Sequence, residues 1–185
     1  MTTYYVDLSA TVNGSGSEGS PYNSFAAFVS SIAGGDRIRV KRGTSKVLNS
    51  GTRLNVTIAS SALETLIDTY GEGAPPVLSG GGTNFNPIYI KRHDGTGRLI
   101  IRDLDVTTAP GSGVVVESAS GQTISNVLLQ GLRAYENNVA NQSGADGIRV
   151  SCAKDGGLIS NVTIDGCDAF NNNGHGIKVR DNTQN

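Results

Sequence analysis

The stretches that decide the fold are Asn126-Val-Leu-Leu-Gln-Gly131 and Asn161-Val-Thr-Ile-Asp-Gly166, which repeat one pattern 35 residues apart. In each stretch, apolar residues alternate after an asparagine, and a glycine ends the run. Alternation with a period of two predicts a strand that buries one side and exposes the other. Because so short a strand cannot bury its apolar side alone, the repeat predicts units that stack on one another.

Two further columns of apolar residues accompany this strand through the second half of the chain. One column precedes it, with steps of 26, 34 and 29 residues, and the other follows it five residues later, with steps of 28 and 35. The three columns are Ile88, Val114, Ile148 and Ile177; Leu99/Ile101, Val127/Leu129 and Val162/Ile164; and Leu104/Val106, Leu132/Ala134 and Cys167/Ala169. Three short strands per unit, stacked with a constant inward side, predict an all-β parallel β-helix of about four to five coils.

The front of the chain, residues 1–35, follows a different pattern. We expect a first strand, a glycine-rich loop, and a short capping helix over residues 25–33 with Asn23 or Ser24 as its N-cap. Such a helix can close the open end of a stacked coil. The sequence therefore predicts an N-terminal cap at one end of the β-helix.

The β-helix itself is expected over residues 36–185. Between Val40 and Ile88 we expect one wide, irregular coil. The pattern Gly176-Ile-Lys-Val-Arg180 opens a new coil, and nothing after it resembles a cap. We therefore expect the β-helix to be incomplete at its C-terminal end.

Composition narrows the function further. The 185 residues suit one domain, and 15 Lys and Arg against 16 Asp and Glu argue against nucleic acid as the partner. No apolar run approaches 18 residues, so we expect no membrane-spanning helix and no membrane partner. The first residues lack the basic and apolar regions of a secretory signal peptide, and two cysteines are too few for a disulfide framework.

Three segments in order resemble the start of right-handed parallel β-helix proteins similar to pectate lyases. They are Tyr4-Tyr-Val-Asp7 with the loop at Ser20-Pro21, Gly35-Asp-Arg-Ile-Arg-Val40, and Asp68-Thr-Tyr-Gly-Glu-Gly-Ala-Pro-Pro-Val-Leu-Ser-Gly80. That group includes polysaccharide lyases, glycosidases, uronan epimerases and bacteriophage tailspike depolymerases. The resemblance implies a polysaccharide ligand along the outer face of one parallel sheet. It implies no single reaction, because the fold hosts several.

Within this group, the missing signal peptide favours a phage tailspike or depolymerase, with a virion or extracellular location. The resemblance implies a homotrimer in that setting. One alternative is a structural or adhesive β-helix without catalysis. Another is a secreted uronan lyase or epimerase whose signal peptide has been removed.

The outward residues of the first strand column are the candidate site. One outward row holds Tyr89, Val115, Arg149 and Lys178, and the next holds Lys91, Glu117, Ser151 and Arg180. With strands about 4.8 Å apart, the cations form a basic strip that can hold the carboxylates of an acidic glycan, with Tyr89 stacking on a sugar. Resemblance to the lyases casts Arg149 or Lys178 as the catalytic base. Lys91, Glu117 and Arg180 are then substrate-binding residues, and the alternative is a charged face that only keeps the protein soluble.

His175 is the remaining catalytic candidate, as a general acid or base at the loop entering the last strand. Its stretch, Asn171-Asn-Asn-Gly-His-Gly176, is similar to the histidine-glycine turn of alginate carbon-5 epimerases. Those enzymes place a Tyr and an Asp-Pro-His stretch two coils earlier, where this chain has Gly113-Val-Val-Val-Glu117. The favoured alternative is therefore a turn residue.

The carboxylates and asparagines are read mainly as structural. Glu117, Asp146 and Asp181 could supply a glycosidase pair, but Asp beside Gly usually forms turns. We assign no cofactor and no metal, since the calcium that some lyases of this fold bind would need an Asp-rich loop of recognisable spacing. Asn137-Asn138 and Asn171-Asn-Asn173 recur after the third strand and predict a ladder of stacked amides.

Overall fold

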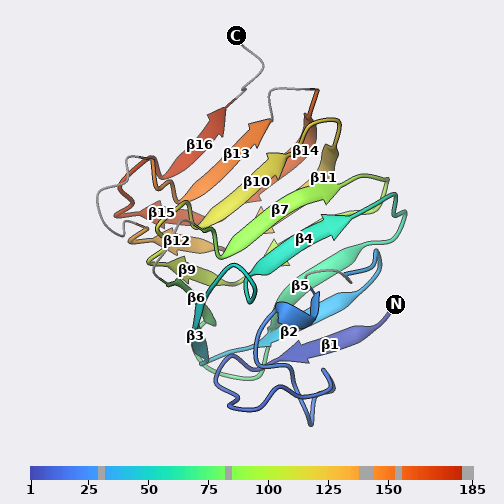
Figure 1. Cartoon of the computed structure of the whole chain (residues 1–185), viewed down its shortest axis with the longest axis vertical. Helices are drawn as coiled ribbons and strands as arrows, with labels where there is room; N and C mark the ends of the chain where they lie inside the picture. The colour runs from blue at the N-terminus through green and yellow to red at the C-terminus, as the bar shows by residue number, and fades with distance from the viewer. Residues whose placement is uncertain (29–31, 82–84, 138–143, 153–155, 181–185) are drawn as a thin grey trace.

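The computed structural model describes residues 1–28, 32–81, 85–137, 144–152 and 156–180. These residues wind into an all-β parallel solenoid of about five turns, with the first strand, β1 (Thr3–Val6), near one end and the last, β16 (Ile177–Arg180), near the other (Figure 1). No helix in this described part of the chain is long and apolar enough to cross a membrane.

The strands stack into three parallel columns, called here the first, second and third sheets, of which the first and second are joined into one 11-stranded sheet where His93 pairs with Ile124. The first sheet contains β4 (Leu54–Ile58), β7 (Ile88–His93), β10 (Val114–Ser118), β13 (Ile148–Cys152) and β16 (Ile177–Arg180). The second contains β1 (Thr3–Val6), β2 (Arg37–Lys41), β5 (Thr65–Tyr70), β8 (Leu99–Arg102), β11 (Thr123–Gln130) and β14 (Leu158–Asp165). The third contains β3 (Ser45–Leu48), β6 (Val77–Gly80), β9 (Asp105–Thr107), β12 (Arg133–Tyr135) and β15 (Asp168–Phe170). The chain runs from the second sheet to the third and then to the first in every coil.

The strand register confirms the three predicted columns. Val114 pairs with Ile88 on one side and Ile148 on the other, and Ile148 pairs with Ile177. The second column pairs Val127 with Leu99 and Val162, and the third pairs Ala134 with Val106 and Ala169. The inward side chains of the central coils are fully buried, which contributes about 1.5–3 kcal/mol for each large apolar residue.

Cys167 occupies its predicted inward position. It packs against the core while remaining partly buried, and its Sγ lies 3.5 Å from the carbonyl oxygen of Leu129. Burial raises the pKa of this thiol, which keeps it protonated.

The predicted asparagine ladder is confirmed at Asn137 and Asn172. Asn137, which is fully buried, donates through Nδ2 to Oδ1 of Asn172 at 2.8 Å and accepts from the backbone N–H of Ala109 at 3.0 Å. Asn172 donates in turn to the carbonyl oxygen of Ala134 at 3.0 Å. The ladder thus ties three successive coils together, while Asn138 lies outside the described residues.

Two rows of left-handed backbone make the corners on either side of the third sheet. The corner before it has Asp103, Gly131 and Gly166 at φ of 59°, 59° and 56°. The corner after it has Thr108, Glu136 and Asn171 at φ of 51°, 53° and 53°. Glycine, asparagine and aspartate tolerate this conformation, whereas Thr108 and Glu136 are unusual there.

The expected wide, irregular coil between Val40 and Ile88 is wrong. The strands β3, β4, β5 and β6 fill this stretch and pair in parallel register with the coils around them. The sequence hid this regularity because β4 lacks the glycine that precedes β10, β13 and β16 in the same sheet. The turns between Val40 and Ile88 are also spaced differently from those of the later coils.

The predicted capping helix over residues 25–33 is also wrong in the part that the structure describes. A single 3₁₀ turn, η1 (Ala26–Phe28), is present, Ile32 and Ala33 are irregular, and residues 29–31 lie outside the described ranges. Phe25 and Phe28 are buried in the core, and Phe28 packs edge-on against Tyr4 and Tyr22 at 5.3 Å between ring centroids. Among the described residues, aromatic packing closes this end.

Candidate functional site

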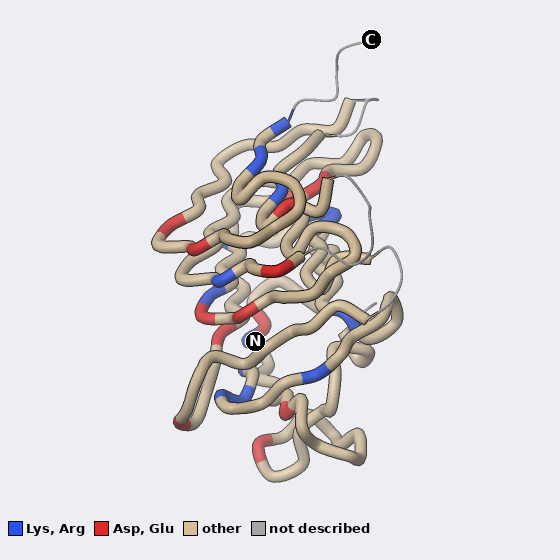
Figure 2. The backbone as a smooth tube through the Cα atoms, turned by 90° about the vertical axis from the view of Figure 1, so that its left-hand side faces the viewer, with Lys and Arg blue, Asp and Glu red and all other residues tan. Residues whose placement is uncertain are grey.

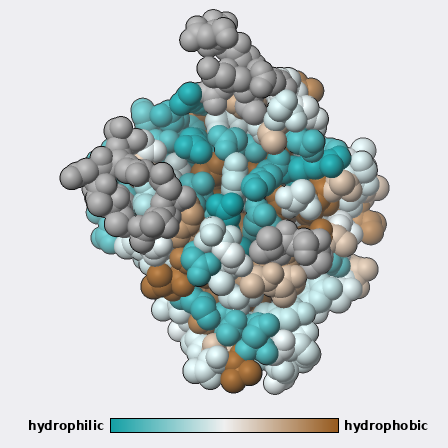
Figure 3. Space-filling view, viewed as in Figure 1, coloured by the Kyte–Doolittle hydropathy of each residue, from teal (hydrophilic) through white to brown (hydrophobic). Residues whose placement is uncertain are grey.

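Two outward rows of the first sheet lie in the register that the alternation predicts. The first row, in register across β7, β10, β13 and β16, is Tyr89, Val115, Arg149 and Lys178. The second is Glu117, Ser151 and Arg180. Hydrophilic residues gather over these strands in the space-filling view (Figure 3).

Lys91 lies at a bulge between β7 and β4, where Ile90 pairs with Val56 and Arg92 with Thr57. A bulge inserts one unpaired residue into a strand. The register of β7 with β10 runs as far as Ile90 and Val116, so the row that joins Lys91 to Glu117 stays a prediction. The Lys91 Nζ lies 5.1 Å from the ring centroid of Tyr89.

Glu117 is the centre of one polar cluster on this sheet. Its Oε2 accepts from the Tyr89 hydroxyl at 2.7 Å, and its Oε1 accepts from the Ser151 Oγ at 3.1 Å. The Arg149 Nη2 lies 3.5 Å from the same Oε1. Two strands, β7 and β13, thus contribute a phenol, a hydroxyl and a guanidinium to one partly exposed carboxylate on β10 between them.

Neighbouring side chains contact both the hydroxyl group and the aromatic ring of Tyr89. The Arg53 guanidinium lies 4.9 Å from its ring centroid, so two cations lie near the ring that we expected to stack on a sugar. Burial, followed by the hydrogen bond to Glu117, raises the pKa of Tyr89 to about 12. Its hydroxyl therefore stays protonated and remains a hydrogen-bond donor across the neutral range.

Arg53 is a site residue that the sequence analysis missed. It precedes β4 and belongs to no repeating column, so the alternation gave no signal for it. Burial lowers the pKa of its guanidinium. Its Nε is buried without a hydrogen-bond partner in the described part of the chain.

A second cluster forms where the chain enters β13 and β16. Asp146, whose side chain is 1% exposed, accepts from the backbone N–H of His175 at 2.8 Å. The same Oδ1 lies 3.1 Å from the Nδ1 of His175, and the Lys178 Nζ lies 3.9 Å from Oδ2. The backbone bond is that of a turn, which agrees with the structural reading of His175. The ring contact uses Nδ1, and the other ring nitrogen, Nε2, belongs to a side chain that is 64% exposed.

The two clusters adjoin because Arg149 and Lys178 are register partners. Their carboxylates, however, share no partner among the described contacts. Asp146 lies at the turn before β13 and accepts from the backbone N–H of His175, whereas Glu117 faces Ser151 inside β13. We therefore read Asp146 as a turn residue rather than as half of a catalytic pair with Glu117, and Asp181 lies outside the described residues.

The first sheet is strongly cationic for so balanced a chain. Five cations on or beside it face two carboxylates in the described residues, while Arg92 and Asp94 pair with each other at 2.7 Å. The cations are Arg53, Lys91, Arg149, Lys178 and Arg180, and the carboxylates are Glu117 and Asp146. The excess of three positive charges contrasts with a net charge of −1 for the whole chain. On the side where the third sheet lies, acidic and basic residues interleave (Figure 2).

Within the described ranges, no three His, Cys, Asp or Glu side chains gather in a way that could hold a metal ion. The groups described above on the first sheet can take part in ion pairing, hydrogen bonding and proton transfer.

Comparison with known proteins connects this architecture to a family. A family model described as a right-handed beta helix region matches residues 88–185. Two crystal structures of a GH136 lacto-N-biosidase from Eubacterium ramulus, native and selenomethionine-labelled, are similar at TM-scores of 0.68 and 0.64, each with 16% identity. The alignments cover 96% of this chain and 40% of that enzyme, so this chain spans less than half of its length. At this identity the likeness concerns the fold alone. No curated protein sequence matches the chain. Since the family model covers more than half of its residues, the chain belongs to the right-handed β-helix family.

Proposed function

We propose that the first sheet binds an anionic polysaccharide, a glycan whose sugars carry carboxylates. The observation that carries this proposal is the excess of three positive charges on one face of a chain that is otherwise nearly neutral. Local excess charge attracts an oppositely charged ligand and raises its concentration at the surface. Arg149 and Arg180 offer the planar N–H fork that matches a carboxylate.

The mixture of groups favours a sugar over another polyanion. Glu117 accepts hydrogen bonds from hydroxyl groups, and Ser151 and Tyr89 supply hydroxyls beside it. A uronate sugar carries both hydroxyls and a carboxylate. The five strands span about 19 Å, enough for several consecutive sugars. The likeness in fold to a lacto-N-biosidase also supports a carbohydrate ligand.

A second candidate function is cleavage of the bound glycan. The observation that favours it is the imidazole of His175 held against the buried Asp146, with Lys178 alongside. An oriented histidine with one free ring nitrogen can act as a general acid or base. The remaining catalytic candidates are Arg149 and Lys178. The residues proposed to bind the glycan are Tyr89, Lys91, Glu117 and Arg180. From the resemblance in sequence we propose that the protein is part of a phage tailspike, is located in the virion and forms a homotrimer.

Binding is tested with polygalacturonate and with the same polymer after its carboxyl groups have been reduced to alcohols. We expect affinity electrophoresis to retard the protein in the first polymer and not in the second. Arg180→Glu should weaken binding about tenfold, because an attraction becomes a repulsion. The matched control is Arg98→Glu, since Arg98 is equally exposed but precedes β8 of the second sheet. Equal retardation in both polymers, or equal losses in both variants, would contradict the proposal.

A further inference from the structure

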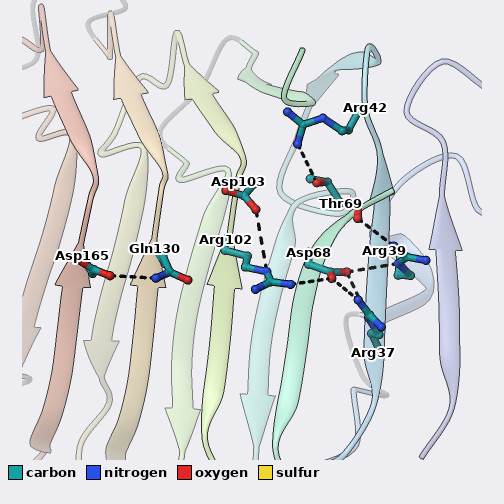
Figure 4. A network of polar contacts seen from close by, with 9 residues as sticks. All are labelled: Arg37, Arg39, Arg42, Asp68, Thr69, Arg102, Asp103, Gln130 and Asp165. Atoms are coloured by element: carbon teal, nitrogen blue, oxygen red, sulfur yellow. Dashed lines mark hydrogen bonds and ion pairs between the residues drawn. The ribbon is translucent and has the colours of Figure 1, made fainter. Parts of the chain in front are cut away.

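A group of arginines on the second sheet plays no part in the proposed function. Arg37, Arg39 and Arg102 converge on the carboxylate of Asp68, whose side chain is 3% exposed (Figure 4). The strand register produces this arrangement, because Asp68 of β5 pairs with Arg39 of β2. On the other side, Ile67 pairs with Ile101, so Arg102 follows beside Asp68.

One of these arginines is enough to neutralise Asp68. A buried carboxylate must be paired to offset the loss of hydration. Arg37 does this alone, because its Nη2 contacts Oδ2 and its Nε lies 3.4 Å from Oδ1. The Arg39 Nε lies farther away, 3.6 Å from Oδ1, and Arg102 adds a single long hydrogen bond from Nη2 to Oδ2 at 3.4 Å. These two guanidinium groups are therefore in excess of what Asp68 requires.

Both guanidinium groups also have unused hydrogen-bond donors in the part of the chain that the structure describes. Each guanidinium has five N–H groups. Arg39 donates from Nη2 to the carbonyl oxygen of Thr69 at 3.2 Å, and the Nε atoms of Arg39 and Arg102 are buried without a hydrogen-bond partner. The nearest carboxylate to the Arg102 Nε is Asp103, at 3.9 Å. The side chains are 29% and 40% exposed, so their outer N–H groups are accessible to a ligand.

The surroundings hold these donors in place and add positive charge. The guanidinium of Arg39 lies 5.8 Å from the ring centroid of Tyr70, which packs edge-on against Tyr5 at 5.1 Å. Arg42 bonds to the Thr69 hydroxyl and the Gly73 carbonyl rather than to a carboxylate. Four guanidinium groups therefore face two carboxylates, those of Asp68 and Asp103, around this point.

We propose that Arg39 and Arg102 form a binding site for one anionic group, a sulfate or carboxylate, that sits across Asp68 on the second sheet. Both guanidinium groups approach the same carboxylate from opposite sides, so both can donate to an anion placed above it. The anion is either a substituent of a sugar or a free inorganic ion. This site is separate from the first sheet and does not depend on the function proposed for it.

The test is an NMR titration of the arginine Nε–H signals of the full chain with sodium sulfate, against sodium chloride at equal ionic strength. We expect the Arg39 and Arg102 signals to shift with sulfate and not with chloride. Arg39→Gln with Arg102→Gln should weaken sulfate binding at least tenfold. Arg98→Gln with Lys46→Gln removes the same charge outside both proposed sites, since Lys46 lies in β3 of the third sheet, and should leave binding unchanged. Absence of a sulfate-specific shift, or an equal loss in both double variants, would overturn the proposal.

Asp68→Asn separates an anion site from an ion-pair network that serves only stability. Removing the negative charge beneath the ligand should tighten sulfate binding at least fivefold, whereas a purely structural network predicts no gain. If this variant does not fold, the arginine double variants still decide. Titration with glucose 6-sulfate distinguishes the two sources, since tenfold tighter binding than inorganic sulfate assigns the site to a glycan. Equal affinity assigns it to a free anion.

Discussion

Glu117 determines how the neighbouring side chains of the first sheet are arranged. It orients the Tyr89 hydroxyl and the Ser151 hydroxyl and balances one of the five cations, Arg149. The alternation of the sequence placed Glu117 and Tyr89 correctly on the outer face. It could not reveal that they contact one another, because their 28-residue separation becomes a contact only through the register of β7 and β10.

Replacing Glu117 by Gln should lower the pKa of Tyr89 from about 12, because a charged acceptor is lost. Burial remains, so the pKa should stay above its ordinary value of about 10. The folded pKa exceeds the unfolded one, so this group stabilises the fold below pH 10, and that contribution is lost as the pH rises through 12. The measurement is the NMR titration of the Tyr89 Cζ signal.

Tyr135 of the third sheet is the internal control for this titration. Burial raises the pKa of its phenol too, and Glu117 is not among the groups that act on it. Its midpoint should therefore stay constant in Glu117→Gln. An unchanged Tyr89 midpoint, or an equal change at both tyrosines, would show that Glu117 does not hold the phenol proton.

At the scale of elements, the corners of each coil are defined by backbone conformation more than by packing. Glu136 adopts φ of 53° at an exposed corner, where glycine has no steric penalty. Glu136→Gly should therefore stabilise the protein by up to about 1 kcal/mol in urea unfolding. Glu64→Gly is the matched control, because exposed Glu64 has no positive φ, and it should destabilise by about 0.5–1 kcal/mol. Destabilisation by both changes would refute the corner argument.

The asparagine ladder should behave as a graded series. Asn137→Ala removes the acceptor of the buried Ala109 N–H and the donor to Asn172, so we expect a loss of about 2–4 kcal/mol. Asn172→Ala, at a half-buried position, should cost less. The measurement is the midpoint and slope of urea unfolding. Equal losses in the two variants would mean that burial does not set the strength of the ladder.

The elements that could be predicted from sequence are those that repeat. The three apolar columns and the asparagine ladder recur at matching spacings, so periodicity alone identified them. The strands β3 to β6 were missed because their coils lack the repeating glycine and have different turns. The bulge at Lys91 and the position of Arg53 depend on how β4 meets β7, which is a tertiary contact with no sequence signal.

At the scale of the molecule, inward residues differ in burial along the solenoid. Val116 of β10 is fully buried, whereas Val179, two strands further along the same sheet and also inward, is 78% exposed. Val116→Ala should therefore cost about 2 kcal/mol or more, and Val179→Ala less than about 0.5 kcal/mol. Unfolding in urea compares the two variants directly. Similar losses would mean that Val179 is covered in solution, for example by self-association, and the mass of the protein in solution would then reveal it.

The parallel register also determines how the chain can fold. Every strand pairs with a strand of the next coil, so the contacting residues are separated by about one coil of sequence, as Glu117 and Tyr89 are by 28 residues. Closing a loop of this length costs roughly 3 kcal/mol of chain entropy beyond a constant. Each added coil meets the same cost and gains the same kind of stacked interface. Once one coil has closed on another, growth of the solenoid is a repetition of a single step, and its difficulty does not increase with the length of the β-helix.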